Sequence, residues 1–231
     1  MINQTQEREE EAASLPRLLS LAVHELRTPV TVVAGYIRML IREQGGPLTD
    51  KQRKMLEEAD RSCTRIAALV LEMSEFGKLE SRELGLERLP FDLAALVAET
   101  AEGMGDDSRG VHVEPRCAER QLMVTGDRAR IATAVRALIH AAVRVRIEPG
   151  VVVAACSVVD AWGVVAVGDD ASLPALVRSG SEAPPGFDEW RGGMGLSLPV
   201  GKRVVESQGG TVWSIGEGQQ RASGLRLPLV P

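Results

Sequence analysis

Six consecutive residues bring a nucleophile, a carboxylate and a hydroxyl together: His24, Glu25, Leu26, Arg27, Thr28 and Pro29. A neutral imidazole is a competent nucleophile when a neighbouring carboxylate orients its tautomer and takes up its proton. Glu25 lies about 100° around a helix from His24, and Thr28 lies one turn further along the same face. The alternative is an ordinary surface histidine. The pattern favours His24 as a nucleophile with Glu25 beside it, and Thr28 shares its exposed face.

A helix is expected to carry these residues, because apolar side chains recur at intervals of three and four along Leu19, Val23, Leu26, Val30, Val33, Ile37 and Leu40. His24 falls about 150° from the centre of this stripe and should face water. Pro29 removes one helical hydrogen bond, so a kink is expected just after the nucleophile.

A second helix is predicted after the break at residues 45–48, where Thr49 and Gln52 can form a capping box. Its apolar stripe runs through Met55, Ala59, Ser62/Cys63, Ile66, Leu69/Val70, Met73 and Phe76. Two helices joined by a short turn form an antiparallel hairpin, and a lone hairpin cannot bury both stripes. We therefore expect two copies to form a four-helix bundle; packing against the rest of the same chain is the alternative.

The six-residue motif resembles the H-box of sensor histidine kinases. This resemblance implies that His24 is phosphorylated and exchanges its phosphoryl group with an aspartate of a response-regulator receiver domain. It also implies that Glu25 assists the transfer, and that Thr28 helps position water when the receiver's phosphoaspartate is hydrolysed. A homodimer through the hairpin and a receiver domain are the expected partners.

The remainder of the chain predicts mixed helices and mainly antiparallel strands, an α+β two-layer sandwich. Helices are expected at residues 93–103, 127–145 and 195–208. A short strand is expected to begin at residue 89, and further strands at 111–113, 121–124, 151–159, 162–167, 210–215 and 225–229, with Asp160-Ala161 as the turn of a hairpin between 151–159 and 162–167. Short phrases resemble the ATP-binding domain of the same kinases, a fold of the gyrase ATPase type: Phe91-Asp92-Leu93, Gly126-Asp127, Gly209-Gly210 and Leu227-Pro228-Leu229. The expected domains are residues 1–80, the phosphoacceptor hairpin, and 81–231, an ATPase-like domain.

The helix that should hold the nucleotide's magnesium departs from the family pattern. In these kinases it carries Asn-x-x-x-Asn-Ala-x-Lys, and the matching residues here place Ala137 and Ala141 at the two asparagine positions. A methyl group cannot bind magnesium, which requires oxygen ligands. Asn3 is the only asparagine in the chain, and we interpret His140 as a partly buried structural residue. No metal ligand is therefore assigned, and neither ATP nor magnesium is assigned as a cofactor.

The glycine-rich segments of the family are partly kept. Asp169 stands where the kinase aspartate binds the adenine amino group, although it could equally be a turn residue. The two glycines that should follow are Ala171 and Leu173, so this loop is expected to take another shape. Gly193 and Gly195 precede a predicted helix, whose N-terminus could hold a phosphate. The candidate nucleotide-binding residues are thus Asp169, Gly193 and Gly195.

Composition narrows the function further. The 231 residues carry a net charge of -5 without a basic run, which argues against nucleic-acid binding. Three cysteines without metal spacing suit structural burial in a reducing cytosol. No apolar run approaches the length of a membrane span, so a cytoplasmic location is expected, and a sensor domain, if the protein uses one, lies outside this sequence.

Three functions are compatible with these observations. The first is phosphoryl exchange at His24 with the chain's own ATP-dependent autophosphorylation impaired or lost. The second is an active kinase that binds ATP in a modified pocket, and it requires magnesium-dependent nucleotide binding. The third is a non-enzymatic scaffold that docks receivers, for which His24 would be dispensable. The first is preferred, because the departures from the family pattern are concentrated in the nucleotide site.

Overall fold

The computed structural model describes residues 2–80, 87–105, 109–180, 184–188, 195–216 and 221–230. The chain divides into two compact units, Met1–Leu84 and Gly85–Pro231. The predicted division after residue 80 borders residues 81–86, which lie outside the described part of the chain. Each unit is treated by itself below.

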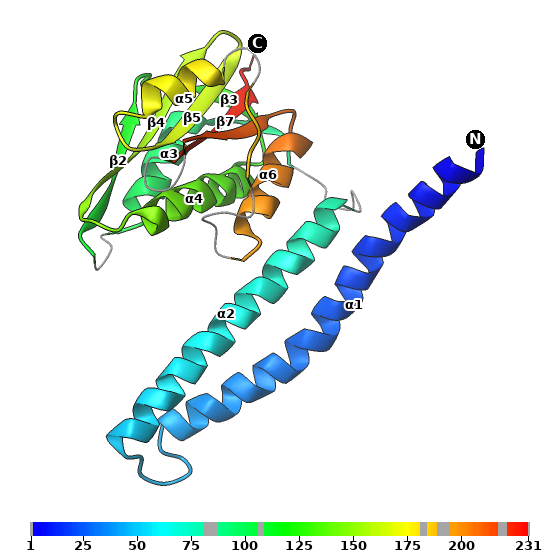
Figure 1. The fold of residues 1–231 in the computed structure, drawn as a ribbon, viewed down its shortest axis with the longest axis vertical. Helices are drawn as coiled ribbons and strands as arrows, with labels where there is room; N and C mark the ends of the chain where they lie inside the picture. Colours follow the sequence, from blue (N-terminus) through cyan, green and yellow to red (C-terminus); the bar gives the residue numbers. More distant parts are fainter. Residues whose placement is uncertain are drawn as a thin grey trace. The chain divides into compact units, whose positions relative to one another are not determined.

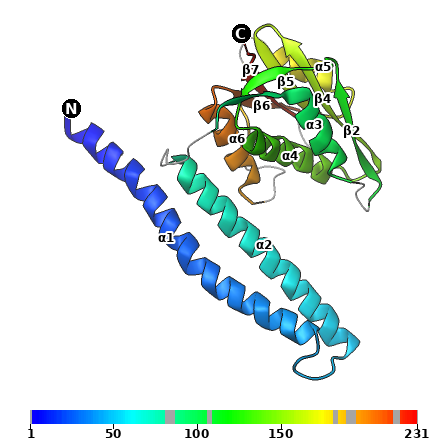
Figure 2. The same ribbon diagram turned by 180° about the vertical axis from the view of Figure 1, so that it is seen from behind.

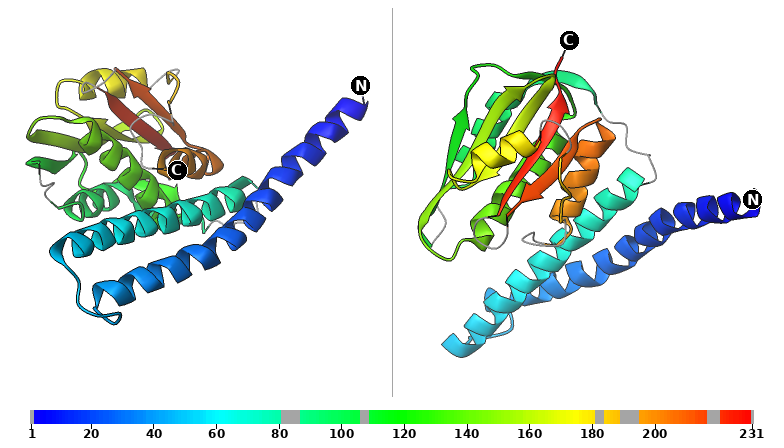
Figure 3. Two further views of the ribbon diagram at one scale, coloured as in Figure 1. Left: turned by 60° about the horizontal axis from the view of Figure 1, so that its bottom comes forward. Right: turned by 45° about the horizontal axis from the view of Figure 1, so that its top comes forward.

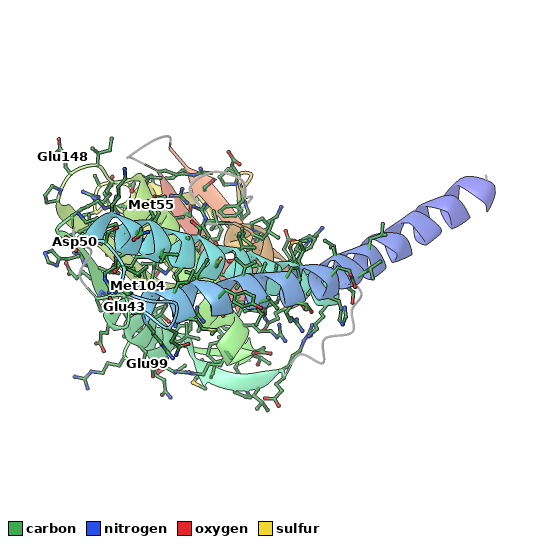
Figure 4. All side chains as sticks on the ribbon, turned by 90° about the horizontal axis from the view of Figure 1, so that it is seen from below. Glu43, Asp50, Met55, Glu99, Met104 and Glu148 are labelled. Carbon is green, nitrogen blue, oxygen red and sulfur yellow. The ribbon has the colours of Figure 1, made fainter. Side chains whose placement is uncertain are left out.

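The first unit is a hairpin of two long helices, α1 (Ile2–Ile41) and α2 (Asp50–Glu80) (Figures 1 and 2). The predicted capping box at the start of α2 is confirmed, because the Thr49 backbone N–H donates to Gln52 Oε1 at 2.9 Å and the Gln52 N–H donates to Thr49 Oγ1 at 3.3 Å. Figure 4 shows Glu43 and Asp50 at the end of the hairpin where the helices connect. Arg53 ties this end together by pairing with Glu43 and donating to the Ile41 carbonyl at 3.1 Å.

The two helices bury a narrow seam and leave other apolar side chains exposed. Val23 and Ala34 of α1 and Cys63 and Val70 of α2 are buried, each with at most 8% of its surface exposed. The Arg38 guanidinium crosses to Asp60 at 2.9 Å beside this seam. Exposed apolar residues are Leu18, Leu21, Leu26, Val32, Val33, Tyr36, Met39 and Leu40 on α1, and Met55, Ile66 and Leu71 on α2. A single hairpin therefore buries only part of its apolar surface.

The second unit contains a five-stranded sheet in the order β2-β4-β5-β7-β6. Its strands are β2 (Val111–Cys117), β4 (Gly150–Val159), β5 (Trp162–Gly168), β6 (Thr211–Ile215) and β7 (Ala222–Pro228). The β2 and β4 strands are parallel, and the other neighbours are antiparallel. A separate antiparallel pair joins β1 (Leu89–Asp92) to β3 (Met123–Gly126). The predicted α+β class is confirmed.

Helices cover both faces of this sheet. One face carries α3 (Leu93–Glu102), α4 (Arg128–Val145) and α6 (Ser197–Ser207), and α5 (Leu173–Ser179) lies on the opposite face (Figures 1 and 3). Successive side chains of β5 point to opposite faces of the sheet, so alternate residues contact different helices. Val164 and Ala166 belong to the core cluster that contains Leu173 and Leu176 of α5. The Trp213 side chain is fully buried in this cluster, and its Nε1 donates to the Leu176 carbonyl at 3.1 Å.

The predicted elements agree with the structure apart from their ends and one helix. The strand predicted at residues 111–113 extends to Cys117, and the last strand begins at Ala222 instead of residue 225. The predicted turn between β4 and β5 is present, with Asp160 in the left-handed region at φ 53°. The helix α5 was not predicted, because its seven residues are too few to show a period.

Candidate functional site

His24 is presented to solvent on α1. Its side chain is 79% exposed, and the side chain of Glu25 is 70% exposed. The His24 Nδ1 lies 3.3 Å from Glu25 Oε1, so the carboxylate favours the tautomer in which Nδ1 carries the proton. The lone pair of Nε2 is then directed away from Glu25, available to an electrophile. The predicted exposure of His24 is present in the structure.

The burial of neighbouring positions fixes which face of α1 carries the histidine. Val23 is only 4% exposed, and His24 follows it by about 100° around the helix. Ala34 is also buried, and Thr28 is exposed one turn beyond His24. Of the stripe predicted along α1, Val23 is buried, whereas Leu26, Val33 and Leu40 are each at least 41% exposed in the single hairpin.

Pro29 lies inside α1 and does not interrupt it. The helix is continuous from Ile2 to Ile41, and Figures 1 and 2 show it as one gently curved ribbon. Because proline has no N–H, the Glu25 carbonyl lacks its usual helical donor one turn later. Thr31 Oγ1 donates to the Arg27 carbonyl at 2.8 Å in the same turn, a contact that also bends helices. The regular hydrogen bonding of α1 is therefore altered at two places shortly after His24, at Pro29 and at Thr31.

The helix α4 carries the two alanines at the family's asparagine positions. Ala137 is buried and Ala141 is half-buried, and their methyl groups line narrow cavities beside α6. His140 is exposed, whereas partial burial was predicted. It precedes Ala141 by one residue, which turns it about 100° around the helix from the cavity that Ala141 lines. Partial desolvation and the nearby Arg136 guanidinium lower the pKa of His140.

Phe187 and Leu198 close the space in front of α4. The cavity bounded by Phe187, Leu198 and α4 has a volume of about 10 Å³, enough for roughly one water molecule, whereas small-molecule sites usually enclose several hundred Å³. Arg221 lines the same cavity and donates to the Asp188 carbonyl at 3.1 Å. The sequence gave no periodic signal for Phe187, because it lies in a segment without helix or strand that the tertiary fold brings against α4.

Asp169 stabilises a turn at the end of β5. Its Oδ1 accepts the Ser172 backbone N–H at 2.8 Å, and Ser172 Oγ donates to the Asp169 carbonyl at 2.9 Å. Ala171 is exposed, and Leu173 begins α5 and is buried in the sheet's core. Positive φ angles among the described non-glycine residues occur only at Glu43 and Asp160, so this turn avoids the left-handed conformation that glycines would permit.

The other two nucleotide candidates lie before α6. Gly195 is exposed with φ 65°, a conformation that favours glycine. Gly193 lies outside the described residues. The structure thus places Asp169 and Gly195 in one unit and His24, Glu25 and Thr28 in the other.

Comparison with known proteins relates the hairpin to one described family. Residues 15–82 match the family described as the His Kinase A (phospho-acceptor) domain. Sensor protein GacS of Pseudomonas syringae pv. syringae is 27% identical over 222 residues, which cover 89% of this chain and 24% of GacS. The histidine protein kinase DivJ of Caulobacter vibrioides is 26% identical over 227 residues, covering 95% of this chain and 38% of DivJ. The chain therefore spans about a quarter of GacS and less than half of DivJ.

Solved structures share the fold. Full-length ShkA in complex with AMPPNP has a TM-score of 0.69 at 22% identity, covering 93% of this chain and 46% of ShkA. The histidine kinase ThkA, solved in complex with the response regulator protein TrrA, has a TM-score of 0.61 at 20% identity, covering 100% of this chain and 66% of ThkA.

A phosphoacceptor-type helical hairpin followed by a mixed α/β unit is the architecture of a histidine kinase core. Residues 15–82 match the phospho-acceptor domain family, and over most of its length the chain is similar to sensor histidine kinases. Among the described residues, no helix is both long and apolar enough to cross a membrane.

Proposed function

We propose that this chain exchanges phosphoryl groups between His24 and the aspartate of a response-regulator receiver domain, and that its own ATP-dependent autophosphorylation is impaired or lost. The observation that carries the proposal is the exposed imidazole held at 3.3 Å from the Glu25 carboxylate. A donor or acceptor that is itself a folded domain requires a histidine standing clear of its surroundings, and His24 meets this requirement.

The reaction follows from the tautomer that Glu25 favours. The Nε2 lone pair of His24 attacks the phosphorus of the receiver's acyl phosphate, and the bond between phosphorus and the aspartate oxygen breaks. The receiver recovers a free carboxylate, and the Nδ1 proton moves toward Glu25, which leaves a neutral phosphoimidazole. The reverse sequence returns the phosphoryl group to a second receiver. ThkA was solved with a response regulator, which supports a receiver as the partner of this chain.

The proposed loss of autophosphorylation rests on the second unit. Ala137 and Ala141 offer methyl groups where the kinase pattern has amide oxygens, and magnesium binds oxygen. Phe187 and Leu198 line a cavity of about 10 Å³ beside Ala141. Asp169 uses Oδ1 to hold its own turn. Together these contacts favour a domain that keeps the ATPase-type fold while holding nucleotide weakly.

Thr28 supports a further activity at the same face of α1. Its hydroxyl is exposed one helical turn from His24, in position to orient water near a docked receiver. We propose that Thr28 contributes to hydrolysis of the receiver's phosphoaspartate. A Thr28→Ala variant should then accept phosphate at His24 as the parent does while draining phosphorylated receiver more slowly.

The exposed apolar side chains of the hairpin support a homodimer. Leu26, Val33 and Leu40 follow one another at intervals of seven on one face of α1, on the side of the helix away from His24, and are each at least 41% exposed. A second copy would cover this face in a four-helix bundle. Light scattering of a Val33→Asp/Leu40→Asp double variant should then show a monomer where the parent is a dimer; a monomeric parent would contradict the assembly.

The phosphoryl exchange is tested with receiver domains of the source organism charged with labelled acetyl phosphate. Acid-labile label should move from a receiver to the chain, and a His24→Gln variant should remain unlabelled. The chain has two other histidines, His112 and His140, both exposed, so His112→Gln and His140→Gln are matched controls that should label normally. Equal labelling of His24→Gln and the parent would overturn the assignment of His24.

A further inference from the structure

Two of the three cysteines are brought together by the sheet. The parallel register of β2 and β4 places Cys117 directly opposite Cys156, and the N–H of Ala118 donates to the Cys156 carbonyl at 3.0 Å. Opposed residues of neighbouring strands lie about 4.8 Å apart with their side chains on the same face. A disulfide requires Cα atoms roughly 4.4–6.8 Å apart, so the backbone here already satisfies the spacing. The 39-residue separation of the two cysteines in the sequence gave no sign of this pairing.

The two thiols differ in access and acidity. Cys156 is buried with 2% of its surface exposed, whereas Cys117 at the end of the edge strand is half-buried. A hydrogen bond from the Cys156 thiol lowers the pKa of Cys117, although burial and the nearby Asp92 carboxylate act in the opposite direction. The same hydrogen bond, together with burial, raises the pKa of Cys156. Cys117 is thus the thiol that ionises first and the one that small reagents reach.

The arrangement also limits other outcomes of oxidation. Cys117 Sγ lies 3.6 Å from the Ala94 carbonyl at the first turn of α3, so the space around the sulfur is restricted. A neighbouring thiol within hydrogen-bonding distance can trap a sulfenic acid faster than a second oxidant molecule arrives. The third cysteine, Cys63, is buried in the other unit.

We propose that Cys117 and Cys156 are a reversible oxidation site for hydroperoxides. The Cys117 thiolate attacks one oxygen of hydrogen peroxide, the O–O bond breaks, and Cys117 becomes a sulfenic acid with release of hydroxide. The Cys156 sulfur then attacks the sulfenic sulfur, and its proton leaves with the hydroxyl group as water. The released hydroxide takes up the proton that Cys117 lost on ionisation, so the two cysteines together lose two electrons and the peroxide is reduced to two water molecules. The disulfide joins edge strand β2 covalently to β4, and a dithiol reductant restores both thiols.

The test uses the full chain with Cys63→Ser, so that only the paired thiols remain. After treatment with a small molar excess of hydrogen peroxide and alkylation of the folded protein, tryptic digestion should yield residues 117–120 linked to residues 147–178. About two thiols per chain should disappear and return with dithiothreitol. Adding Cys156→Ser should leave a sulfenic acid at Cys117 that dimedone captures, and adding Cys117→Ser should leave Cys156 reduced under the same treatment.

Three results would overturn the proposal. Both thiols could remain titratable after peroxide, Cys117 could proceed to sulfinic acid while Cys156 stays alkylatable, or the linked peptides could come from two chains, which a non-reducing gel distinguishes. The Cys63→Ser chain must show the far-UV spectrum of the parent, which excludes unfolding as the cause of any thiol reactivity.

Discussion

Asp92 should be one of the residues on which the α/β unit depends most, because a single carboxylate oxygen satisfies three backbone donors. Asp92 Oδ1 accepts the N–H of Ala94 at 2.9 Å, of Ala95 at 3.4 Å and of Leu122 at 3.0 Å. The first two contacts cap helix α3, and the third holds the segment that leads into β3. Replacing Asp92 by alanine would therefore release a helix cap and a tertiary contact together.

The size of the effect can be built from these contacts. Removing an N-cap side chain costs about 1 kcal/mol, and up to about 2 kcal/mol in proteins. The Leu122 N–H would lose its acceptor next to a side chain that is only 1% exposed, which costs roughly 1–3 kcal/mol. The sum is about 3 kcal/mol for Asp92→Ala, a large share of the roughly 5–15 kcal/mol that stabilises a typical domain. In urea this corresponds to a midpoint lowered by about 1.5 M if the slope is about 2 kcal/mol per M.

Tryptophan fluorescence during urea unfolding measures this change. The three tryptophans, Trp162, Trp190 and Trp213, all lie in the second unit, so the signal reports on that unit alone. Asp92→Asn keeps a side-chain oxygen at the same place and should cost under about 1 kcal/mol. Asp127→Ala is a second comparison: Asp127 caps α4 through one backbone N–H, that of Arg130 at 3.2 Å, and also pairs with the Arg130 side chain at 3.1 Å, so its loss should cost about 1–2 kcal/mol.

A loss below about 1 kcal/mol for Asp92→Ala would refute this reasoning, since either the Leu122 N–H would have found water or the cap would contribute nothing. Equal losses for Asp92→Ala and Asp92→Asn would be a different contradiction, because the effect would then come from the negative charge and not from the hydrogen bonds.

Three further outcomes follow from the described contacts. Thr49→Ala removes the capping box and should cost about 1 kcal/mol, seen as faster amide exchange in the first turn of α2; unchanged exchange would contradict the box. Gly180→Ala places a methyl group against the indole of Trp213, so it should destabilise the unit by about 1–3 kcal/mol and alter the tryptophan emission; an unchanged urea midpoint would show that the ring can move away. Because Cys156 lowers the pKa of Cys117 from its ordinary 9.0, alkylation of Cys117 should be half-maximal below pH 9, and Cys156→Ala should shift that midpoint upward; no shift would mean that the two thiols are not hydrogen-bonded.

Local signals in the sequence were sufficient for most of the helices and strands and for the exposure of His24. The three-and-four spacing around Val23 gave α1 and the exposure of His24, and Thr49 with Gln52 gave the start of α2. Asp160 marked the turn between β4 and β5, since aspartate tolerates the left-handed conformation. Each of these features depends on residues within one or two turns of each other.

The features that the sequence did not reveal depend on distant residues. Phe187 reaches α4 only through the tertiary fold, and α5 is held by the contact between Trp213 and Leu176 across 37 positions. His140 was expected to be partly buried, but its environment depends on which face of α4 packs against the sheet. Contacts between residues far apart in the sequence depend on the strand order and register of the sheet, and no local pattern specifies these.

The source of the phosphoryl group on His24 tests the account most directly. The purified chain is incubated with magnesium and γ-labelled ATP. A second sample is incubated with a labelled, phosphorylated receiver domain that has been shown to exchange phosphoryl groups with the chain. His24→Gln serves as the blank in both samples. The account predicts acid-labile label on His24 from the receiver and none above the blank from ATP. Label from ATP that His24→Gln lacks would contradict it, and the chain would then be a working kinase despite Ala137 and Ala141.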